Sequence, residues 1–224
     1  SADVVVTINP ATNAGTNGAL TLCDDGAATD LFSQLGGTPQ TGGTWTGPSA
    51  LTNGDQGTFT PGTNIAGTYT YTVTGVAPCA DASADVVVTI NPATNAGTNG
   101  ALTICTTGSA IDLFSQLGGT PQTGGNWTGP SVLTNGDQGT FTPGTNIAGT
   151  YTYTVAGVAP CTDATADVVV TTTSSPDAGT NGVIALCDSD TAIDLFNVLG
   201  GTPDPGGIWT GPSALSNGDQ GTFT

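Results

Sequence analysis

The clearest pattern along the chain is a strict alternation of threonine with larger apolar residues. Residues 68–74 read Thr-Tyr-Thr-Tyr-Thr-Val-Thr, which predicts a strand with one apolar face and one hydroxyl-bearing face. Residues 18–23 also alternate, and residues 85–91 form an apolar run that ends at a proline. Both segments predict further strands. Asn-Gly, Gly-Pro and Asn-Gly-Asp signals between such runs predict tight turns.

One segment has a helical rather than an alternating pattern. Residues 30–36, Asp-Leu-Phe-Ser-Gln-Leu-Gly, predict a single helical turn with Asp30 as its N-cap and Gly36 at its end. Residues 42–48 predict a strand that carries a buried tryptophan. We therefore expect an aromatic core made of Trp45, Trp127, Trp209, Tyr69, Tyr71, Tyr151 and Tyr153.

The chain repeats itself every 82 residues. The segment Ser1–Val6 recurs at residues 83–88 and, with one change, at residues 165–170. Residues 1–82 and 83–164 are identical at 73 of 82 positions, whereas the third copy has diverged more. A period of this length is too long for a solenoid unit and suits a small domain.

Several short strands separated by turn signals predict an all-β fold, namely tandem immunoglobulin-like antiparallel β-sandwich domains with one short helical turn per repeat. We place the domain boundaries by the cysteines. Residues 1–13 are then the terminal strand of a preceding repeat, 14–95 and 96–177 are complete repeats, and 178–224 is an incomplete one.

Five cysteines recur with the repeat. Pairing within a unit gives Cys23–Cys79 and Cys105–Cys161 and leaves Cys187 unpaired by truncation. We favour this pairing, because closing a loop of 57 residues would stabilise so small a domain by about 4 kcal/mol. Pairing between units, Cys79–Cys105, remains open. Either pairing indicates an oxidising, extracytoplasmic location.

The composition excludes several functions. The chain has no Lys, Arg or His, and its 17 acidic residues give a net charge of −17. Without basic residues we expect no nucleic-acid binding, and no apolar run is long enough for membrane insertion. Without His or Lys the familiar nucleophile systems are excluded, so we expect no enzyme, no catalytic residues and no bound cofactor.

Two weaker kinds of site remain. Calcium at the unit junctions would need clustered oxygen ligands, and the candidates are Asp81, Asp85, Asp163, Asp167 and Asp177. Thr191 lies in a short Asp-Thr-Ala motif similar to the O-glycan acceptor of the Bacteroidota. The alternative for all of these residues is a solvated turn position.

The order Cys23, Trp45, Cys79 is similar to the immunoglobulin pattern of a tryptophan beside a disulfide, although Ala77 stands where a tyrosine corner would need Tyr. The whole unit more closely resembles the tandem Ig-like repeats of giant cell-surface adhesins of gliding bacteria of the Bacteroidota. The phrases that carry this resemblance are residues 177–182, 194–196, 199–203, 42–45 and 67–73. The resemblance implies secretion by the type IX route and a gliding-motility-associated surface filament.

Together these features predict a non-catalytic shaft of an extracellular adhesin or filament on the bacterial cell surface, whose partners are further copies of the same repeat. The surface or glycan that the whole protein would contact is not given by the sequence. Two alternatives are a multivalent module that binds glycans or proteins and a filament subunit completed by strand donation from residues 3–8.

Overall fold

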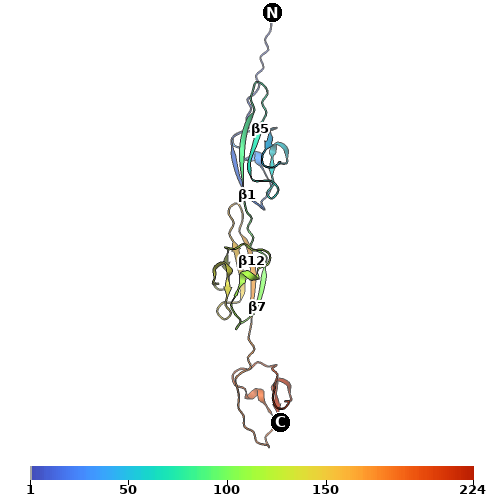
Figure 1. The fold of residues 1–224 in the computed structure, drawn as a ribbon, viewed down its shortest axis with the longest axis vertical. Helices are drawn as coiled ribbons and strands as arrows, with labels where there is room; N and C mark the ends of the chain where they lie inside the picture. The colour runs from blue at the N-terminus through green and yellow to red at the C-terminus, as the bar shows by residue number, and fades with distance from the viewer. Residues whose placement is uncertain (1) are drawn as a thin grey trace.

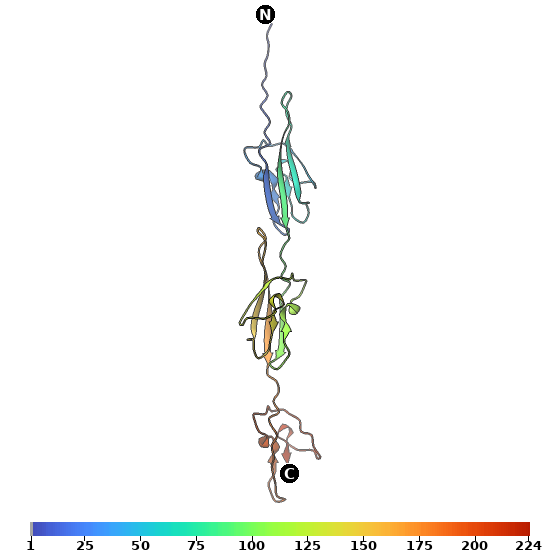
Figure 2. The same ribbon diagram turned by 60° about the vertical axis from the view of Figure 1, so that its left-hand side comes forward.

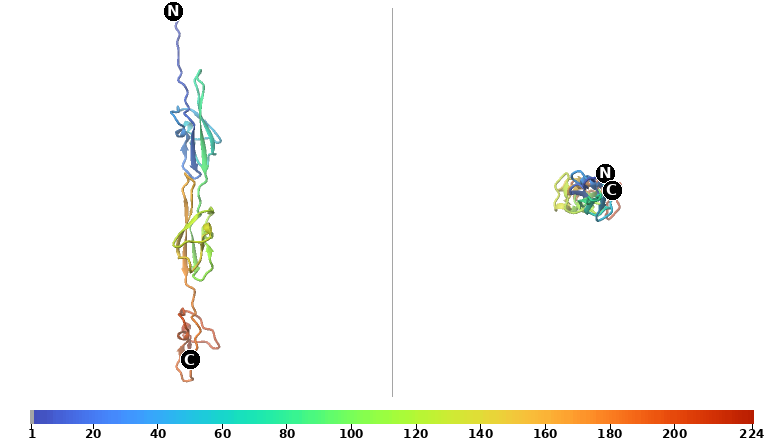
Figure 3. Two further views of the ribbon diagram at one scale, coloured as in Figure 1. Left: turned by 90° about the vertical axis from the view of Figure 1, so that its left-hand side faces the viewer. Right: turned by 90° about the horizontal axis from the view of Figure 1, so that it is seen from above.

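The computed structural model describes residues 2–224 and shows an elongated chain of three parts in a row (Figure 1). The two ends of the chain lie at opposite ends of the row, and the parts overlap when the molecule is viewed along its length (Figure 3). Ser1, where the predicted terminal strand begins, lies outside the described residues. Within residues 2–224, no helical segment has the length and apolarity needed to cross a bilayer.

The first part is a sandwich of two unequal sheets. A four-stranded sheet has the order β1-β6-β5-β3, and a two-stranded sheet of β2 and β4 faces it. The strands are β1 (Gly18–Cys23), β2 (Thr29–Asp30), β3 (Thr44–Thr46), β4 (Thr58–Phe59), β5 (Gly67–Val73) and β6 (Ala82–Asn91).

The second part repeats this arrangement with the order β7-β12-β11-β9 and a two-stranded sheet of β8 and β10. Its strands are β7 (Gly100–Cys105), β8 (Ile111–Asp112), β9 (Asn126–Thr128), β10 (Thr140–Phe141), β11 (Gly149–Val155) and β12 (Ala164–Thr173). The all-β sandwich predicted from the sequence is therefore confirmed for two successive copies of the repeat.

The third part has only the small sheet, formed by β13 (Ile193–Asp194) and β14 (Thr222–Phe223). Residues 182–187 match β1 and β7 in sequence position but form no strand. The boundaries predicted at residues 13, 95 and 177 stay a prediction, although each of the two hydrophobic cores draws its residues from a single complete repeat.

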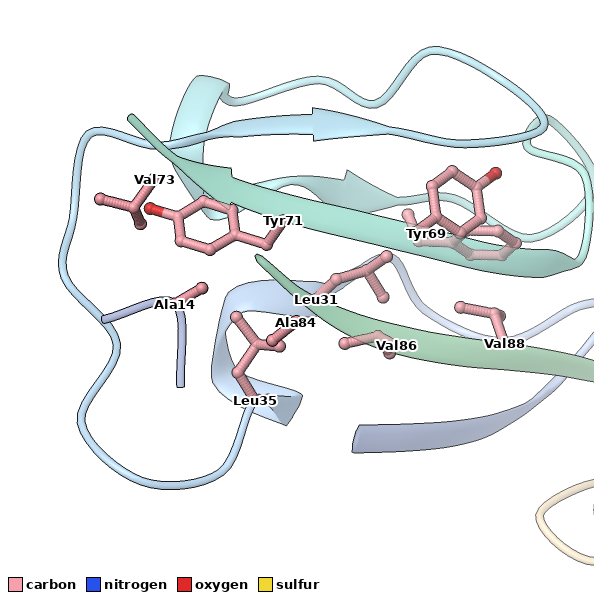
Figure 4. Close-up of a cluster of buried hydrophobic side chains, with 10 residues drawn as sticks. Ala14, Leu31, Leu35, Tyr69, Tyr71, Val73, Ala84, Val86 and Val88 are labelled. Carbon is pink, nitrogen blue, oxygen red and sulfur yellow. The ribbon is translucent and has the colours of Figure 1, made fainter. Parts of the chain in front are cut away.

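The core of the first sandwich follows from the alternation in β5. Tyr69 and Tyr71 are fully buried between the sheets (Figure 4), and the threonines that alternate with them along β5 are more exposed. The ring of Phe59 meets Tyr69 edge-on, with 5.7 Å between ring centroids. Val86 of β6 and Leu31 are also fully buried against this cluster. Tyr151 and Tyr153 have the same positions in the second sandwich.

The three tryptophans are half-buried rather than fully inside the core. Trp45 lies on β3, which is an edge strand of its sheet, so one side of the indole stays open. Its other side packs on Tyr71 with 5.0 Å between ring centroids, and its Nε1 donates to the carbonyl oxygen of Asp55 at 2.9 Å. Trp127 and Trp209 donate in the same way to the equivalent carbonyl oxygens.

Each repeat carries the expected helical turn as a 3-10 turn, and a second, shorter 3-10 turn at the Asn-Gly-Asp signal. The expected turns are η1 (Leu31–Gln34), η3 (Leu113–Gln116) and η5 (Leu195–Val198); the shorter ones are η2 (Gly54–Gln56), η4 (Gly136–Gln138) and η6 (Gly218–Gln220). Asp30 precedes η1 but makes no side-chain cap bond; its carboxylate accepts a hydrogen bond from the Thr58 hydroxyl.

One strand pairing differs from the antiparallel expectation. β1 lies parallel to β6, with Gly18 opposite Val86 and Cys23 opposite Asn91. β7 and β12 pair in the same parallel register. Because the first and last strands run in the same direction, the chain enters each sandwich at one end and leaves at the other. This topology places the contact between successive units at the ends of β1 and β6.

Candidate functional site

The candidate site is the junction between the first and second sandwiches. The hairpin of β11 and β12 continues beyond its sheet, and its tip, residues 156–163, reaches the end of the first sandwich (Figure 2). We call this segment the second hairpin tip. The equivalent first hairpin tip, residues 74–81 between β5 and β6, points toward the N-terminal segment (Figure 2).

A disulfide joins the two sandwiches. Cys23, the last residue of β1, is bonded to Cys161 in the second hairpin tip, with 4.9 Å between their Cα atoms. Both cysteines are buried, with exposed fractions of 7% and 8%. Successive units are thus connected twice, through the peptide linker and through this bond.

The predicted pairs Cys23–Cys79 and Cys105–Cys161 are therefore wrong, and the alternative Cys79–Cys105 is not formed either. The reason is the parallel topology. Cys23, in β1, lies beside the last residue of β6, Asn91. Cys79 lies at the opposite end, just before β6 begins at Ala82. A strand of this length spans about 30 Å, far more than the 4.4–6.8 Å between Cα atoms that a disulfide allows.

Hydrogen bonds hold the linker against the second hairpin tip. The side-chain amide of Asn91, the last residue of β6, donates to the carbonyl oxygen of Ala159 at 2.8 Å. The Thr94 hydroxyl donates to the carbonyl oxygen of Thr162 at 2.7 Å. The Asn91 carbonyl oxygen also accepts from the backbone N–H of Asp24 at 2.9 Å, so the same residue fixes the end of the first sheet.

The next linker residue, Asn95, is bound to the body of the second sandwich. Its backbone N–H donates to Gln122 Oε1 at 2.9 Å, and its side-chain amide donates to the carbonyl oxygen of Thr120 at 3.1 Å. Gln122 returns a backbone hydrogen bond to the Asn95 carbonyl oxygen at 2.8 Å. The linker between the sandwiches is therefore bonded to protein along most of its length, which limits bending at this junction.

The predicted calcium ligands are used by local turns and strands. Asp81 Oδ1 accepts from the backbone N–H of Gly75 at 2.8 Å and closes the first hairpin tip. Asp85 Oδ1 accepts from the Thr70 hydroxyl at 2.7 Å across the β5–β6 pair. The second copy repeats both contacts through Asp163 and Asp167, and Asp177 Oδ1 accepts from Gly179.

Within residues 2–224, the structure gathers none of these carboxylates into a metal-binding group. The group it does gather is Cys23, Asp25 and Cys161, whose ligand atoms lie within 4.8 Å of one another. The two sulfurs are joined as a disulfide and offer no thiolate, which is the form of cysteine that binds metal. Calcium binding by this chain stays a prediction.

Thr191 is exposed on the third part. The preceding residue, Asp190, uses its carboxylate to accept from the backbone N–H of Cys187 at 2.6 Å. O-glycosylation at Thr191 therefore stays a prediction with an accessible hydroxyl.

Three cysteines have free thiols, namely Cys79, Cys105 and Cys187. Cys105 ends β7 and lies 3.3 Å from the Thr107 hydroxyl. The hydrogen bond from this hydroxyl, with further ones from the Thr107 backbone and Ser175, lowers the pKa of the Cys105 thiol from 9.0 to about 7. The thiol is therefore about half ionised near pH 7. The thiolate is the nucleophilic form of cysteine, so Cys105 is ready to react near neutral pH.

Sequence reasoning missed the projecting hairpin. The clue was the connection between the strands at residues 67–73 and 82–91, which is longer than the two to five residues usual for a β-hairpin loop. Gly75 and Pro78 also mark it as a loop, but no local sequence signal shows that its cysteine has a partner outside the same unit. Only the direction of the hairpin, beyond the end of the sheet, shows that the partner belongs to the neighbouring unit.

No family model and no curated protein matches the chain. Among solved structures, it is similar to a crystal structure described as Sidekick-1 immunoglobulin domains 1-4, with 16% sequence identity and a TM-score of 0.27. The match covers 75% of this chain and 52% of that one, so the chain spans about half the length of that structure.

Proposed function

We propose that this chain is a non-catalytic shaft segment of an extracellular adhesin or cell-surface filament. The observation that carries the proposal is the Cys23–Cys161 bond, which fastens one sandwich to the next in addition to the linker. Two domains that are joined at two points cannot bend or extend freely at their junction. A stalk that holds something away from a surface must keep its length and direction in this way. A binding or catalytic role would not by itself require a second covalent connection.

Two further features support this role. The disulfide suits an oxidising compartment, which for a bacterial protein means the periplasm or the outside of the cell. The net charge of −17, without any basic residue, makes neighbouring chains repel one another rather than associate side by side. Assignment to the bacterial cell surface, to gliding motility and to type IX secretion rests on the sequence resemblance alone.

The second candidate is a multivalent binding module for glycans or partner proteins. The half-buried Trp127 favours it, because this side chain lines a surface hollow together with Asn126, Pro130 and Leu133. Aromatic rings at such positions are common contacts for ligands. The indole Nε1 is already bonded to the Asp137 carbonyl oxygen, so only the ring face is free. Titration with glycans, followed by tryptophan fluorescence, would detect such binding, and a Trp127→Ala variant is its control.

A filament subunit completed by strand donation is the third candidate. Val4, Val5 and Val6 are 78–88% exposed and form no strand, so they are available to a partner. However, residues 1–13 carry only the sequence of β6, and a complete sheet also needs β5 with its two buried tyrosines. A donated N-terminal segment would leave the third part without this central strand, which makes the shaft the better-supported proposal.

Stretching the full chain between its two ends tests the shaft. With the disulfide intact, tension passes from Cys23 to Cys161 and residues 24–160 stay unloaded. Extended chain measures about 3.3–3.6 Å per residue, so the disulfide would keep about 450 Å of chain from extending under tension. We expect a Cys161→Ser variant, or added reductant, to release that length in single-molecule force spectroscopy.

The control is a Cys79→Ser variant, whose cysteine lies at the matching position of the first hairpin tip and has no disulfide partner. It should extend like the unaltered chain. If the unaltered chain under oxidising conditions extends as far as the Cys161→Ser variant, the junction does not carry load and the shaft proposal fails.

A further inference from the structure

We propose that Cys79 and Cys105 each form an inter-unit disulfide of the same kind as Cys23–Cys161, with a cysteine of another copy of this repeat. Cys79 would bond to the β1-end cysteine of the unit before it, and Cys105 to the hairpin-tip cysteine of the unit after it. The inference concerns covalent connectivity and does not depend on what the shaft carries.

The first support is the equivalence of the positions. Cys105 follows Cys23, and Cys161 follows Cys79, by one repeat of 82 residues. Cys105 ends β7, which lies parallel to β12, as Cys23 ends β1, which lies parallel to β6. The bonded pair Cys23–Cys161 therefore shows what a cysteine at each of these positions does when the neighbouring unit offers the matching cysteine.

The second support is the way the first hairpin tip is held. Asn9 donates to the carbonyl oxygen of Ala77 at 2.9 Å, as Asn91 does to Ala159. Thr12 donates to the carbonyl oxygen of Ala80 at 2.6 Å, which repeats the contact of Thr94 with the second tip. The first hairpin tip is thus bound by the N-terminal segment in the same way as the second tip is bound by the linker, although no further unit lies beside it in the described chain.

The sulfur atoms have matching surroundings as well. Cys161 Sγ lies 3.5 Å from the Asn91 carbonyl oxygen, and Cys79 Sγ lies 3.7 Å from that of Asn9. Cys161 is buried by its partner unit, whereas Cys79 is half-buried. The free thiol therefore already occupies the place of the bonded sulfur and lacks only the partner.

Cys79 and Cys105 cannot satisfy one another. Cys79 lies at the N-terminal end of the first sandwich, in the first hairpin tip, while Cys105 lies at the far end of the second sandwich, where β7 ends (Figure 1). Two sandwiches separate them. Each needs a partner from a further repeat.

The chemistry is a two-electron oxidation in which the oxidant is a small disulfide such as oxidised glutathione. The Cys105 thiolate attacks one glutathione sulfur, forms a mixed disulfide and releases one glutathione thiolate. The partner cysteine, as thiolate, then attacks the Cys105 sulfur and releases the second glutathione. Two cysteine thiols and one oxidised glutathione thus become one protein disulfide and two reduced glutathiones. The lowered pKa of Cys105 makes its thiolate available for the first step near neutral pH.

A recurring bond of this kind would change how force travels. From Cys161 the chain runs along β12, through the linker and on to Cys187, the next cysteine at the β1-end position. A disulfide there leads into the hairpin tip of the unit that follows. β12 already runs as an extended strand along this path, so an array linked in this way would contain two interleaved covalent paths from one end to the other.

The test adds one unit to the full chain. A copy of residues 1–82 is inserted after Ala164, which restores the native junction sequence because Ser1 then takes the place that Ser83 has after Ala82. The lengthened chain is refolded with reduced and oxidised glutathione, its free thiols are blocked, and it is digested without reduction by a protease that cleaves before aspartate. Mass spectrometry then identifies the linked peptides.

We expect two linked pairs, residues 3–23 with 137–162 and residues 85–111 with the 55–80 peptide of the inserted copy. A Cys79→Ser change in the inserted copy should abolish the second pair, whereas Cys79→Ser in the original copy should leave both pairs intact. A link between peptides 3–23 and 55–80 would overturn the proposal. So would a Cys105 that is recovered entirely as the blocked free thiol after oxidation. A Cys105 thiol that stays free would leave the stretching experiment on the original chain unaffected, because that experiment depends only on Cys23–Cys161, so the two proposals can fail separately.

Discussion

Residues 3–8 and 85–90 have the same sequence, Asp-Val-Val-Val-Thr-Ile, and opposite surroundings. Val86 and Val88 are 0% and 2% exposed in the middle of a sheet, whereas Val4 and Val6 are 87% and 78% exposed and form no strand. The local preference of the segment is identical in both places. What differs is the pair of neighbouring strands, β1 and β5, that receives the second copy and not the first.

The third part of the chain shows the same dependence on neighbouring strands, here for the segment that corresponds to β1. Gly18–Cys23 forms β1 because β6 lies beside it, and β6 is its only neighbour in the sheet. Residues 182–187 have the matching sequence position but no such neighbour, form no strand, and leave Val183 96% exposed. Strand formation in this repeat is therefore decided by the complete sheet rather than by β-propensity.

The largest difference in unfolding free energy should appear when the same charge is placed at the equivalent position of the buried and of the exposed copy. Val86→Asp puts an unpaired carboxylate between the two sheets, and we expect the first sandwich to lose at least about 4 kcal/mol of unfolding free energy or not to fold. Val4→Asp should change it by less than about 0.5 kcal/mol. Denaturant unfolding followed by circular dichroism measures both; equal effects would refute the comparison.

A smaller effect should follow from truncating the phenylalanine of the small sheet. Phe59 is fully buried and Phe223, its equivalent in the third part, is 45% exposed. Phe59→Ala removes a core ring and should cost about 3–5 kcal/mol. Phe223→Ala should cost about 1 kcal/mol or less, because little of its surface leaves water on folding. Thermal unfolding of the two variants compares a complete unit with an incomplete one, and a Phe223→Ala loss as large as that of Phe59→Ala would contradict this reading.

A still smaller effect is expected at the junction. Asn91→Ala removes the hydrogen bond to Ala159, and we expect a loss of about 1 kcal/mol in the stability of the second hairpin tip. Native-state hydrogen exchange of residues 156–163 measures it. Asn9→Ala, the matched control, should leave that exchange unchanged, since Asn9 contacts only the first hairpin tip. Unaltered exchange in Asn91→Ala would show that the linker contact does not fix the tip.

The smallest expected change concerns the reactivity of Cys105. Hydrogen bonds led by Thr107 lower its pKa from 9.0 to about 7, so its thiolate forms as the pH rises through 7. Alkylation by iodoacetamide should therefore reach half its maximal rate near pH 7. In Thr107→Val the midpoint should move up toward the ordinary value. A midpoint near pH 9 in the unaltered chain would show that these hydroxyls do not act on the thiol.

The period, the all-β class and the strand that carries the tyrosines could be predicted because each depends on residues close together in sequence. The alternation of residues 68–74 fixes which side chains face inward whatever the strand pairs with. The half-buried state of Trp45 could not be predicted, since it depends on β3 being the outer strand. The disulfide depends on the parallel pairing of β1 with β6 and on the direction of a hairpin, and neither leaves a local signal.

The central claim is that a disulfide joins successive units, and a disulfide map of the unaltered chain tests it most directly. Cleavage before aspartate places the five cysteines on five different peptides, residues 3–23, 55–80, 85–111, 137–162 and 177–187. Non-reducing mass spectrometry should find residues 3–23 linked to 137–162, and the other three peptides with free thiols. A link between residues 3–23 and 55–80, which would close the bond inside one unit, would contradict the account.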